Sequence, residues 1–323
     1  MYDNDVSIQL EFRDIEYVNM ILECNSFSKA AVNLHITQPA LSIYIKMLEK
    51  RLGVPVFNRL GKTITLTEAG KYLIAEGKQI LLAKDNITKK INEIKYTEHG
   101  IIRVGATPTR GISLFPQMAK IYNELYPHVS VVFHEHSAQE IEQMVCDGKL
   151  DIGYFNRIGM NNKLNYTSII SDPVVVFTSP EIAKQIKTHT TTGYQYPWVN
   201  LAELKDLPFI RNYDDQNTEK ITTRIFKDFK MHPPVAAKIR NQLTAINMAA
   251  HGCGLYIAPE YFLYNLSLSR QPTILSFGQT PNEYDIEFVA AVAKGAYCSN
   301  IIRDFIKHSK EIYNYKLFSR ELL

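Results

Sequence analysis

The regular alternation of strand-like and helix-like segments from Ile101 to the end of the chain constrains the fold more than any other feature of this sequence. Residues 101–106 predict a strand that a helix follows to about residue 126, and residues 129–134 predict the next strand. A Ser-x-x-Glu capping box over Ser137 to Glu140 opens another helix. The pattern continues with strands expected at 150–155, 174–178, 208–211, 235–240, 254–258 and 287–293, and with helices expected at 218–229, 242–251 and 299–312.

Repeated β-α units of this kind predict an α/β fold in which a largely parallel sheet carries helices on both faces. The segment 97–323 is long enough for two such lobes. We expect lobe I to comprise about 97–172 and 282–323, and lobe II about 173–281. The polar stretch 185–200, which contains Trp198, predicts a loop insertion between the lobes.

Residues 8–66 have a different pattern, which predicts short helices followed by a pair of strands. Ser26 is placed to cap one short helix, and Thr37 is placed to cap the next, with Pro39 in its first turn. Gly53 is expected to end that helix. Alternating apolar residues over 54–57 and 63–66 predict two strands that a turn at residues 59–62 joins.

A single long helix is expected over residues 67–96. Leu73, Ile80, Ile87 and Ile94 recur every seven residues within it. Such a row is typical of a coiled-coil seam with a second copy of the chain. The alternative is that the helix docks against the chain's own domain, because the second row of the heptad is not consistently apolar.

Charge is concentrated near the beginning of the chain. The whole sequence has 36 basic and 33 acidic residues, but residues 26–65 contain six basic side chains against the single acid Glu49. A basic patch on a nearly neutral protein is the electrostatic signature of a polyanion partner. We find no apolar run long enough for a membrane helix and no secretory signal, so we expect a cytoplasmic protein without membrane contact.

The predicted third helix presents a polar face that suits DNA. In a helix-turn-helix the second helix places its first turns against base edges in the major groove, and a following hairpin reaches the backbone or minor groove. Gln38 can pair with adenine or phosphate, and Lys46 with phosphate. The candidate DNA-binding residues are Ser26, Ser28, Thr37, Gln38, Pro39, Ser42, Ile43, Lys46, Arg59 and Lys62. The alternative is a three-helix protein-binding module with a solvated polar tip.

Several motifs in this order closely resemble the LysR-type transcriptional regulators. They are the segments Ser26 to Ala31, Leu34 to Ser42, Leu48 to Arg59 and Leu66 to Gly70, with looser matches at Leu150 to Gly153 and Gly252 to Leu255. The resemblance implies a winged helix-turn-helix over 8–66, a linker and dimerisation helix over 67–96, and an effector-binding domain over 97–323 that is similar to periplasmic solute-binding proteins. It also implies a homo-tetramer on paired double-stranded DNA sites near a promoter, with RNA polymerase as a further candidate partner.

One departure from the family pattern falls on the DNA-facing helix. The family usually carries Ser-Arg-Gln where this chain has Ser42-Ile43-Tyr44. The family's DNA contact is therefore not carried over to position 43. Ile43 is instead suited to a thymine methyl group, and Tyr44 to a phosphate.

The second region is expected to bind a small molecule beyond the carboxyl ends of its strands, where helix N-termini attract anions. The candidate effector-binding residues are Thr107, Thr109, His136, Ser137, Arg211, Asn212, Gln242 and Thr244. Thr and Ser at such positions also serve as simple helix caps. We expect a small anion between the lobes with Arg211 as its charge partner, unless Asp214 and Asp215 face inward. No cofactor is expected; the resemblance implies a small-molecule co-inducer.

The sequence also offers two rival sites and one rival class of protein. His134 and His136 share a strand face but have no evident third metal ligand, so no metal site is expected. Cys253 could sense oxidants, but it lacks an evident resolving cysteine, which favours a buried small residue. An enzyme is not expected, because we find no Gly-x-Gly-x-x-Gly, P-loop or nucleophile motif.

Overall fold

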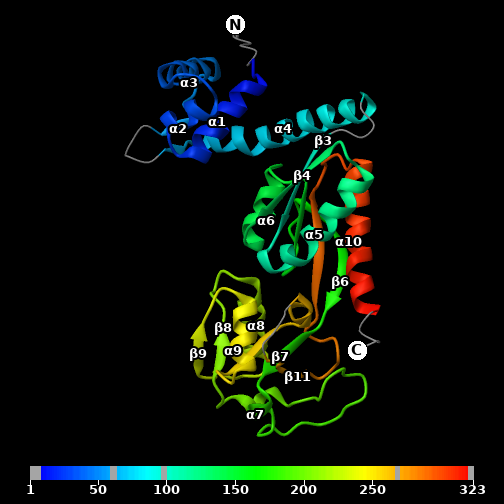
Figure 1. The fold of residues 1–323 in the computed structure, drawn as a ribbon. Coiled ribbons are helices and arrows are strands. Elements are labelled where there is room, and N and C mark those ends of the chain that lie inside the picture. The colour runs from blue at the N-terminus through cyan, green and yellow to red at the C-terminus, as the bar shows by residue number, and fades with distance from the viewer. Residues whose placement is uncertain (1–8, 59–63, 96–99, 266–269, 319–323) are drawn as a thin grey trace. The chain divides into compact units, whose positions relative to one another are not determined.

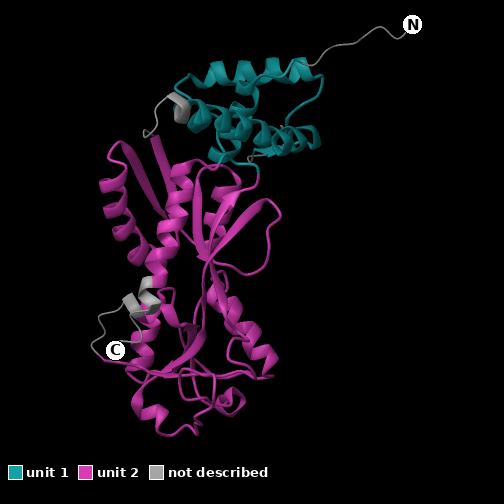
Figure 2. Cartoon of the chain, turned by 90° about the vertical axis from the view of Figure 1, so that its right-hand side faces the viewer, with its two compact units in different colours: residues 1–95, 295–297 teal, residues 96–294, 298–323 magenta. Residues whose placement is uncertain are grey.

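The computed structural model describes residues 9–58, 64–95, 100–265 and 270–318. The chain divides into two compact units, shown in Figure 2. Residues 1–95 and 295–297 form the N-terminal unit, and residues 96–294 and 298–323 form the C-terminal unit.

The N-terminal unit begins with three short helices, labelled in Figure 1, and also contains a small two-stranded sheet. The helices are α1 (Phe12–Cys24), α2 (Phe27–Asn33) and α3 (Gln38–Leu52), and strands β1 (Phe57–Asn58) and β2 (Thr65–Leu66) pair antiparallel. The first strand begins at Phe57 and not at residue 54 as predicted, because the backbone N–H groups of Val56 and Phe57 donate to the Glu49 carboxylate at 2.8 and 3.2 Å. The predicted turn at 59–62 lies outside the described residues.

The helix ends of this unit follow from their capping residues. Ser26 Oγ accepts a hydrogen bond from Lys29 N, and Thr37 Oγ1 accepts one from Ala40 N, each at 3.3 Å. Gly53 ends α3 with φ of 71°, a conformation that glycine adopts without steric cost. The apolar faces of the three helices then form one core, which includes Val18, Ile21, Ala30, Leu41, Ile45 and Leu48.

The long helix α4 (Glu68–Lys95) docks on the same core at its beginning. Thr67 Oγ1 accepts from Gly70 N at 3.1 Å, and Leu73 packs against the core. A side chain at Gly77 would lie 2.5 Å from Ile15 Cγ2, so α4 and α1 approach closely there. This end of the helix therefore fits the alternative of docking within one chain.

Further along α4 the apolar row faces away from the chain's own core. Ile80 is 40% exposed and Ile87 is 61% exposed. The side chain of Ile94, the last member of the row, lies outside the described residues. This exposed part of the row is accessible to a second copy of the chain, and the contact with that copy stays a prediction.

Lobe I of the C-terminal unit is built on a five-stranded sheet. Its strands β3 (Gly100–Ala106), β4 (Val129–Glu135), β5 (Ile152–Asn156), β6 (Leu164–Asp172) and β12 (Ile286–Ala293) have the order β4-β3-β5-β12-β6. Helices α5 (Pro108–Leu125) and α10 (Asn300–Phe318) pack on the core around Val104, Tyr154 and Phe288. Helix α6 (Ala138–Cys146) covers the opposite face, where Gly105 and Gly153 let Ile141 approach.

Lobe II repeats this plan with a second five-stranded sheet. Strands β7 (Val174–Thr178), β8 (Phe209–Arg211), β9 (Val235–Lys238), β10 (Leu255–Pro259) and β11 (Thr273–Leu275) have the order β11-β7-β10-β8-β9. The helices of this lobe are α7 (Pro180–Ala183), α8 (Asn217–Asp228) and α9 (Gln242–Ala250), with short 3-10 turns at Leu201–Leu204 and Glu260–Asn265.

The expectation of a largely parallel sheet is wrong, because both sheets are mixed. β3 runs parallel to β4 and β5, but β12 runs antiparallel to β5 and β6. In lobe II, β8 runs parallel to β9 and β10, but β7 runs antiparallel to β10 and β11. The antiparallel strands include those through which the chain passes between the lobes, since β6 leads through Pro173 into β7. Such a passage has no crossover helix to impose a parallel return.

The predicted insertion at 185–200 belongs to lobe II and does not lie between the lobes. Trp198 forms bridges with His189 and with Ser276, and Val199 is buried in the core of lobe II. Trp198 Nε1 also donates to the carbonyl oxygen of Gly278 at 2.8 Å. Residues 185–200 are therefore held against the sheet of lobe II.

Candidate functional site

The exposed face of α3 carries most of the residues that the sequence assigned to DNA. Gln38, Pro39, Ile43 and Lys46 are exposed, and Ser42 is half-buried. Gln38 Nε2 donates to Ser42 Oγ at 2.8 Å, so these two side chains lie together at the beginning of the helix. Lys46 follows one turn after Ser42, which places amide, hydroxyl and ammonium groups along one surface.

The remaining DNA candidates fall into two groups. The hydroxyls of Ser26 and Thr37 cap α2 and α3, while Ser28 is exposed in the first turn of α2. Arg59 and Lys62 lie outside the described residues.

The opposite side of α3 is fixed by a buried carboxylate on α1. Tyr44 Oη donates to Asp14 Oδ1 at 2.8 Å, and Arg51 forms an ion pair with the same carboxylate. Burial and the hydrogen bond to Asp14 raise the pKa of Tyr44 to about 12. The prediction that Tyr44 contacts a phosphate is therefore wrong: its hydroxyl is engaged inside the unit, because Asp14 needs partners there.

A cavity of about 510 Å³ lies within the C-terminal unit, between its two lobes. The N-terminal ends of four helices line it: α5 and α6 from lobe I, and α8 and α9 from lobe II. Its lining residues are Thr107, Pro108, Thr109, Ser137, Ala138, Glu140, Asn156, Asp215, Gln216, Asn217, Thr218, Arg240, Asn241, Gln242 and Phe262. Because the first N–H groups of a helix lack intrahelical partners, this arrangement gathers hydrogen-bond donors around one volume.

In two of the four helices, no N-cap side chain accepts a hydrogen bond from a first-turn N–H group. Ser137 Oγ accepts from Glu140 N, and Asn241 Oδ1 accepts from Thr244 N. The N-cap residue of α5, Thr107, makes no such bond, and neither does Gln216 at the beginning of α8. The ends of α5 and α8, which come from opposite lobes, therefore lack a side-chain cap; at α5, Pro108 has no N–H and Arg110 N donates to Thr107 O at 2.9 Å.

Two hydrogen bonds cross the cavity and join the lobes. Thr109 Oγ1 donates to Gln242 Oε1 at 3.0 Å, and Asn217 Nδ2 donates to the carbonyl oxygen of Asn156 at 2.9 Å. All four residues line the cavity. A molecule that fills the cavity would meet or replace these contacts, so its binding is linked to the spacing of the lobes.

The charged groups of the cavity are one arginine and two carboxylates. Arg240 Nη1 lies 2.8 Å from Asp215 Oδ2, and this hydrogen bond lowers the pKa of Asp215. Glu140 accepts from Ser137 Oγ at 2.7 Å and Ser137 N at 2.9 Å, which lowers the pKa of Glu140. Both carboxylates are therefore ionised at neutral pH, and both already have donors.

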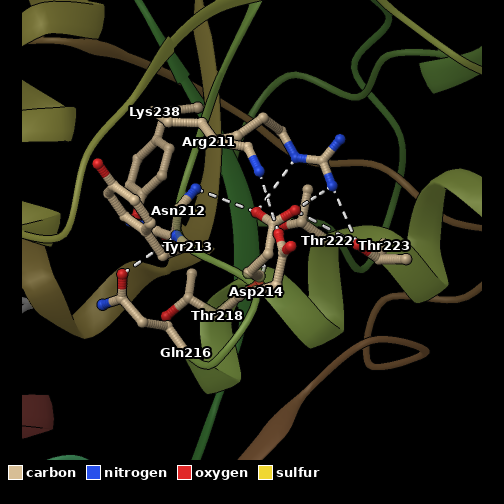
Figure 3. A network of polar contacts seen from close by, with 11 residues as sticks. Arg211, Asn212, Tyr213, Asp214, Gln216, Thr218, Thr222, Thr223 and Lys238 are labelled. Atoms are coloured by element: carbon tan, nitrogen blue, oxygen red, sulfur yellow. Dashed lines mark hydrogen bonds and ion pairs between the residues drawn. The ribbon is translucent and has the colours of Figure 1, made fainter.

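Arg211 does not line the cavity, which corrects its expected place there; its side chain belongs instead to the polar network of Figure 3. Its guanidinium forms an ion pair with Glu219 of α8 and donates to Thr223 Oγ1 at 3.0 Å. Asn212 N donates to the same Glu219 carboxylate at 3.0 Å, and Asn212 Nδ2 donates to Ile239 O at 2.7 Å. Both side chains are used to join β8 to its neighbours, because partly buried polar groups there need partners.

The other candidates divide between the cavity wall and its surroundings. Thr107, Thr109, Ser137 and Gln242 line the cavity, whereas His136 and Thr244 do not. The sequence analysis missed Asn156, Gln216, Asn217, Arg240 and Asn241. Gln216 and Asn241 are the N-cap residues of α8 and α9, and Asn217 is the first residue of α8, which begins one residue earlier than predicted. The residues that precede each predicted helix were therefore the signal that could have found them.

The described part of the chain includes the residues of both rival sites. No group of three or more His, Cys, Asp or Glu side chains suited to a metal ion occurs among the described residues. Cys253 is exposed, which corrects the prediction of a buried residue. It stands between Gly252 and Gly254, whose φ angles are 80° and 148°. Among the described helices, none has the length and apolar content to cross a membrane.

Comparison with known proteins agrees with this architecture. Residues 12–71 match the family model for bacterial regulatory helix-turn-helix proteins of the lysR family, and residues 97–313 match the LysR substrate binding domain. The uncharacterized HTH-type transcriptional regulator YcgK of Bacillus subtilis is 26% identical over 313 residues, which cover 94% of each chain. A probable RuBisCO transcriptional regulator of Chlorokybus atmophyticus is 28% identical over 230 residues, 71% of each chain.

Solved structures share the fold over nearly the whole length. A full-length OxyR variant from Pseudomonas aeruginosa has a TM-score of 0.68 at 17% identity and covers 94% of this chain and 95% of its own. CbnR in complex with its target DNA has a TM-score of 0.56 at 16% identity and covers 94% and 100%. A helix-turn-helix unit together with a substrate-binding domain defines a DNA-binding transcriptional regulator. Within that class, the chain belongs to the LysR family.

Proposed function

We propose that this regulator recognises specific DNA sequences and that a small anion bound between the lobes of its C-terminal unit adjusts its activity. The observation that carries the proposal is the meeting of four helix N-termini at one cavity of about 510 Å³. Each N-terminus has a positive electrostatic potential, which favours negative charge nearby. The two ends without side-chain caps, at α5 and α8, are the proposed binding points.

Arg240 takes the role of charge partner that the sequence gave to Arg211. Arg240 lines the cavity and forms an ion pair with Asp215, which also lines it. The two carboxylates do not make the cavity a cation site, because Asp215 is neutralised by Arg240 and Glu140 accepts from Ser137. An anion would compete with Asp215 for the Arg240 guanidinium while it accepts hydrogen bonds from the Thr107 hydroxyl and from the beginning of α8.

A thermal-shift screen of the full chain tests this proposal. The panel contains small carboxylates, inorganic phosphate and sulfate, together with polyamines and divalent cations as the opposite charge class. We expect an anion to raise the melting temperature, as mass action requires for a ligand of the folded state. Stabilisation only by the cations would contradict an anionic effector.

A variant pair then tests the role of Arg240. Arg240→Gln removes one charge-assisted hydrogen bond at this exposed site and should weaken binding of the anion roughly tenfold. The matched control is Arg224→Gln, an exposed arginine on α8 outside the cavity. Equal affinity in both variants would remove Arg240 from the site.

The DNA-binding half of the proposal assigns contacts to the exposed part of the helix-turn-helix. The proposed contact residues are Ser26, Ser28, Thr37, Gln38, Pro39, Ser42, Ile43, Lys46, Arg59 and Lys62. We further propose a cytoplasmic homodimer joined through the exposed row on α4, assembling into a tetramer on double-stranded DNA, where RNA polymerase is a partner. The exposed Ile80 and Ile87 support this assembly, because isolated apolar rows in water are unfavourable.

A further inference from the structure

We propose that Ile43 and Met47 read the 5-methyl groups of two thymines in each half-site of the DNA. This inference rests on the proposed sequence-specific binding and adds the chemistry by which the bases are distinguished. At position 43 the base is then recognised through an apolar contact, and not through the hydrogen-bond donors of the arginine that the LysR family usually carries there.

The first argument is the exposure of two apolar side chains on α3. Ile43 is 59% exposed and Met47 is 61% exposed, whereas Leu41, Ile45 and Leu48 of the same helix are buried. Residues four apart lie next to each other on a helix surface, so Ile43 and Met47 form one apolar pair. The pair lies on the side opposite to the core, where nothing in the described chain covers it.

The second argument is the character of the groups around the pair. Lys46 lies between the two residues in sequence, and Lys50 follows Met47; both are exposed. Lysines at such positions are suited to phosphates and hold the helix against the polyanion. Tyr44 adds no donor to this surface, because its hydroxyl is bound to Asp14.

The third argument is the code of the major groove. Guanine and adenine are read there by paired donors and acceptors, which neither isoleucine nor methionine has. A T·A pair presents an apolar methyl group, which an apolar side chain can cover. The two side chains stand about 6 Å apart along the helix axis, close to two base-pair steps of roughly 3.4 Å.

The fourth argument is the rigidity of the helix that carries the pair. Arg51 and Tyr44 hold α3 to Asp14 of α1, and Glu49 holds it to the strand that follows. Isoleucine is also restricted to one dominant rotamer in a helix. Ile43 can therefore meet a methyl group without a large loss of side-chain entropy.

The test begins with selection of binding sites by the full-length protein from a library of random-sequence duplexes. Each thymine of the enriched duplex is then replaced by deoxyuridine, which removes the methyl group and keeps the base pair. Covering one methyl group is worth roughly fourfold in affinity (about 0.8 kcal/mol). We expect a fourfold loss when deoxyuridine replaces the thymine that Ile43 contacts, and the same loss at the second position, which Met47 contacts. A duplex with both replacements should bind roughly tenfold or more weakly.

Variants assign each methyl group to its side chain. Ile43→Ala should have the same affinity for the thymine duplex and for the duplex with uracil at the position assigned to Ile43. That affinity should equal the affinity of the wild type for the uracil duplex. The control Lys50→Ala should weaken both duplexes by the same factor. Ile43→Arg should enrich guanine at that position, since arginine pairs with guanine in the major groove.

The outcomes separate this inference from the function on which it rests. Equal wild-type affinity for thymine and uracil duplexes would overturn the methyl reading while specific binding stands. Undiminished discrimination by Ile43→Ala would also overturn it for that residue, because the methyl effect would then come from DNA shape or another side chain. Failure to enrich any sequence would overturn sequence-specific binding itself, and the inference with it.

Discussion

Asp14 organises the helix-turn-helix through a single carboxylate. Its Oδ2 atom accepts from Glu11 N at 2.8 Å, while its Oδ1 atom accepts from Tyr44 Oη and pairs with Arg51. The side chain is fully buried, so each of these partners offsets part of the cost of removing the charge from water. One residue on α1 thus decides the orientation of α3, which carries the proposed DNA contacts.

The hydroxyl of Tyr44 should give a measurable pH dependence. Tyr44→Phe is expected to cost about 1 kcal/mol of the free energy of unfolding at neutral pH, through the lost hydrogen bond. The folded-state pKa of Tyr44 is raised to about 12 from 10. The contribution is therefore complete below pH 10 and is lost as the pH rises through 12. Urea unfolding of both proteins at several pH values checks this; a difference that persists unchanged above pH 12 would contradict it.

At the scale of the element, the contacts proposed for α3 divide into contacts to bases and contacts to phosphates. Lys46→Ala should weaken binding to all DNA sequences and reduce the slope of log affinity against log salt by about 1, because one phosphate contact is lost. Gln38→Ala should instead weaken the specific site more than random DNA, and leave the slope unchanged. Affinity titrations at several salt concentrations distinguish the two; identical slopes in both variants would refute the assignment.

The helix α4 carries a prediction about assembly. The two ends of its apolar row have different surroundings: Leu73 packs against the core of the N-terminal unit, whereas Ile87 is exposed. Ile87→Lys should split the proposed dimer, because a charge would be buried at the seam. It should leave the unfolding temperature of the N-terminal unit nearly unchanged, because the side chain touches none of its core. Sedimentation gives the mass, and an unaltered oligomer would show that the seam lies elsewhere.

At the scale of the whole molecule, the passage between the lobes is held by a buried ion pair. Arg110 of α5 is fully buried and pairs with Asp172, the last residue of β6 before the chain enters lobe II. Arg110 also donates to Asn156 Oδ1, at 3.2 Å from Nε and 2.8 Å from Nη2, and Asn156 lines the cavity. A continuous set of polar contacts therefore runs from the cavity wall to the crossover.

Breaking this pair should destabilise the C-terminal unit strongly. Arg110→Met leaves the Asp172 carboxylate buried without its cation, and we expect a loss of about 3–5 kcal/mol. Adding Asp172→Asn should recover part of that loss, because asparagine is neutral and still accepts from Tyr261 N, which lies 3.1 Å from Asp172 Oδ1. Thermal unfolding of the single and double variants measures the difference. A double variant less stable than Arg110→Met would show that the charge is not the cause.

The sequence by itself determined the local features of this protein. Capping residues such as Ser26, Thr37 and Ser137 mark helix starts through bonds to residues three positions away, so their effect can be read from short segments. Hydrophobic periodicity located α3, α4 and the strand–helix alternation for the same reason. The basic region and the departure at Ile43 are also visible without coordinates.

Only the tertiary structure decided which distant groups meet. Arg211 and Arg240 both lie between a strand and the helix that comes next in the sequence. Arg211 forms an ion pair with Glu219, whereas Arg240 lines the cavity. Tyr44 turns inward because Asp14, thirty residues earlier, lies beneath it. The antiparallel strands β6 and β12 arise from the passage of the chain between lobes, which leaves no periodic signal. Long-range pairing depends on the full set of competing partners, and a local pattern of residues does not contain that information.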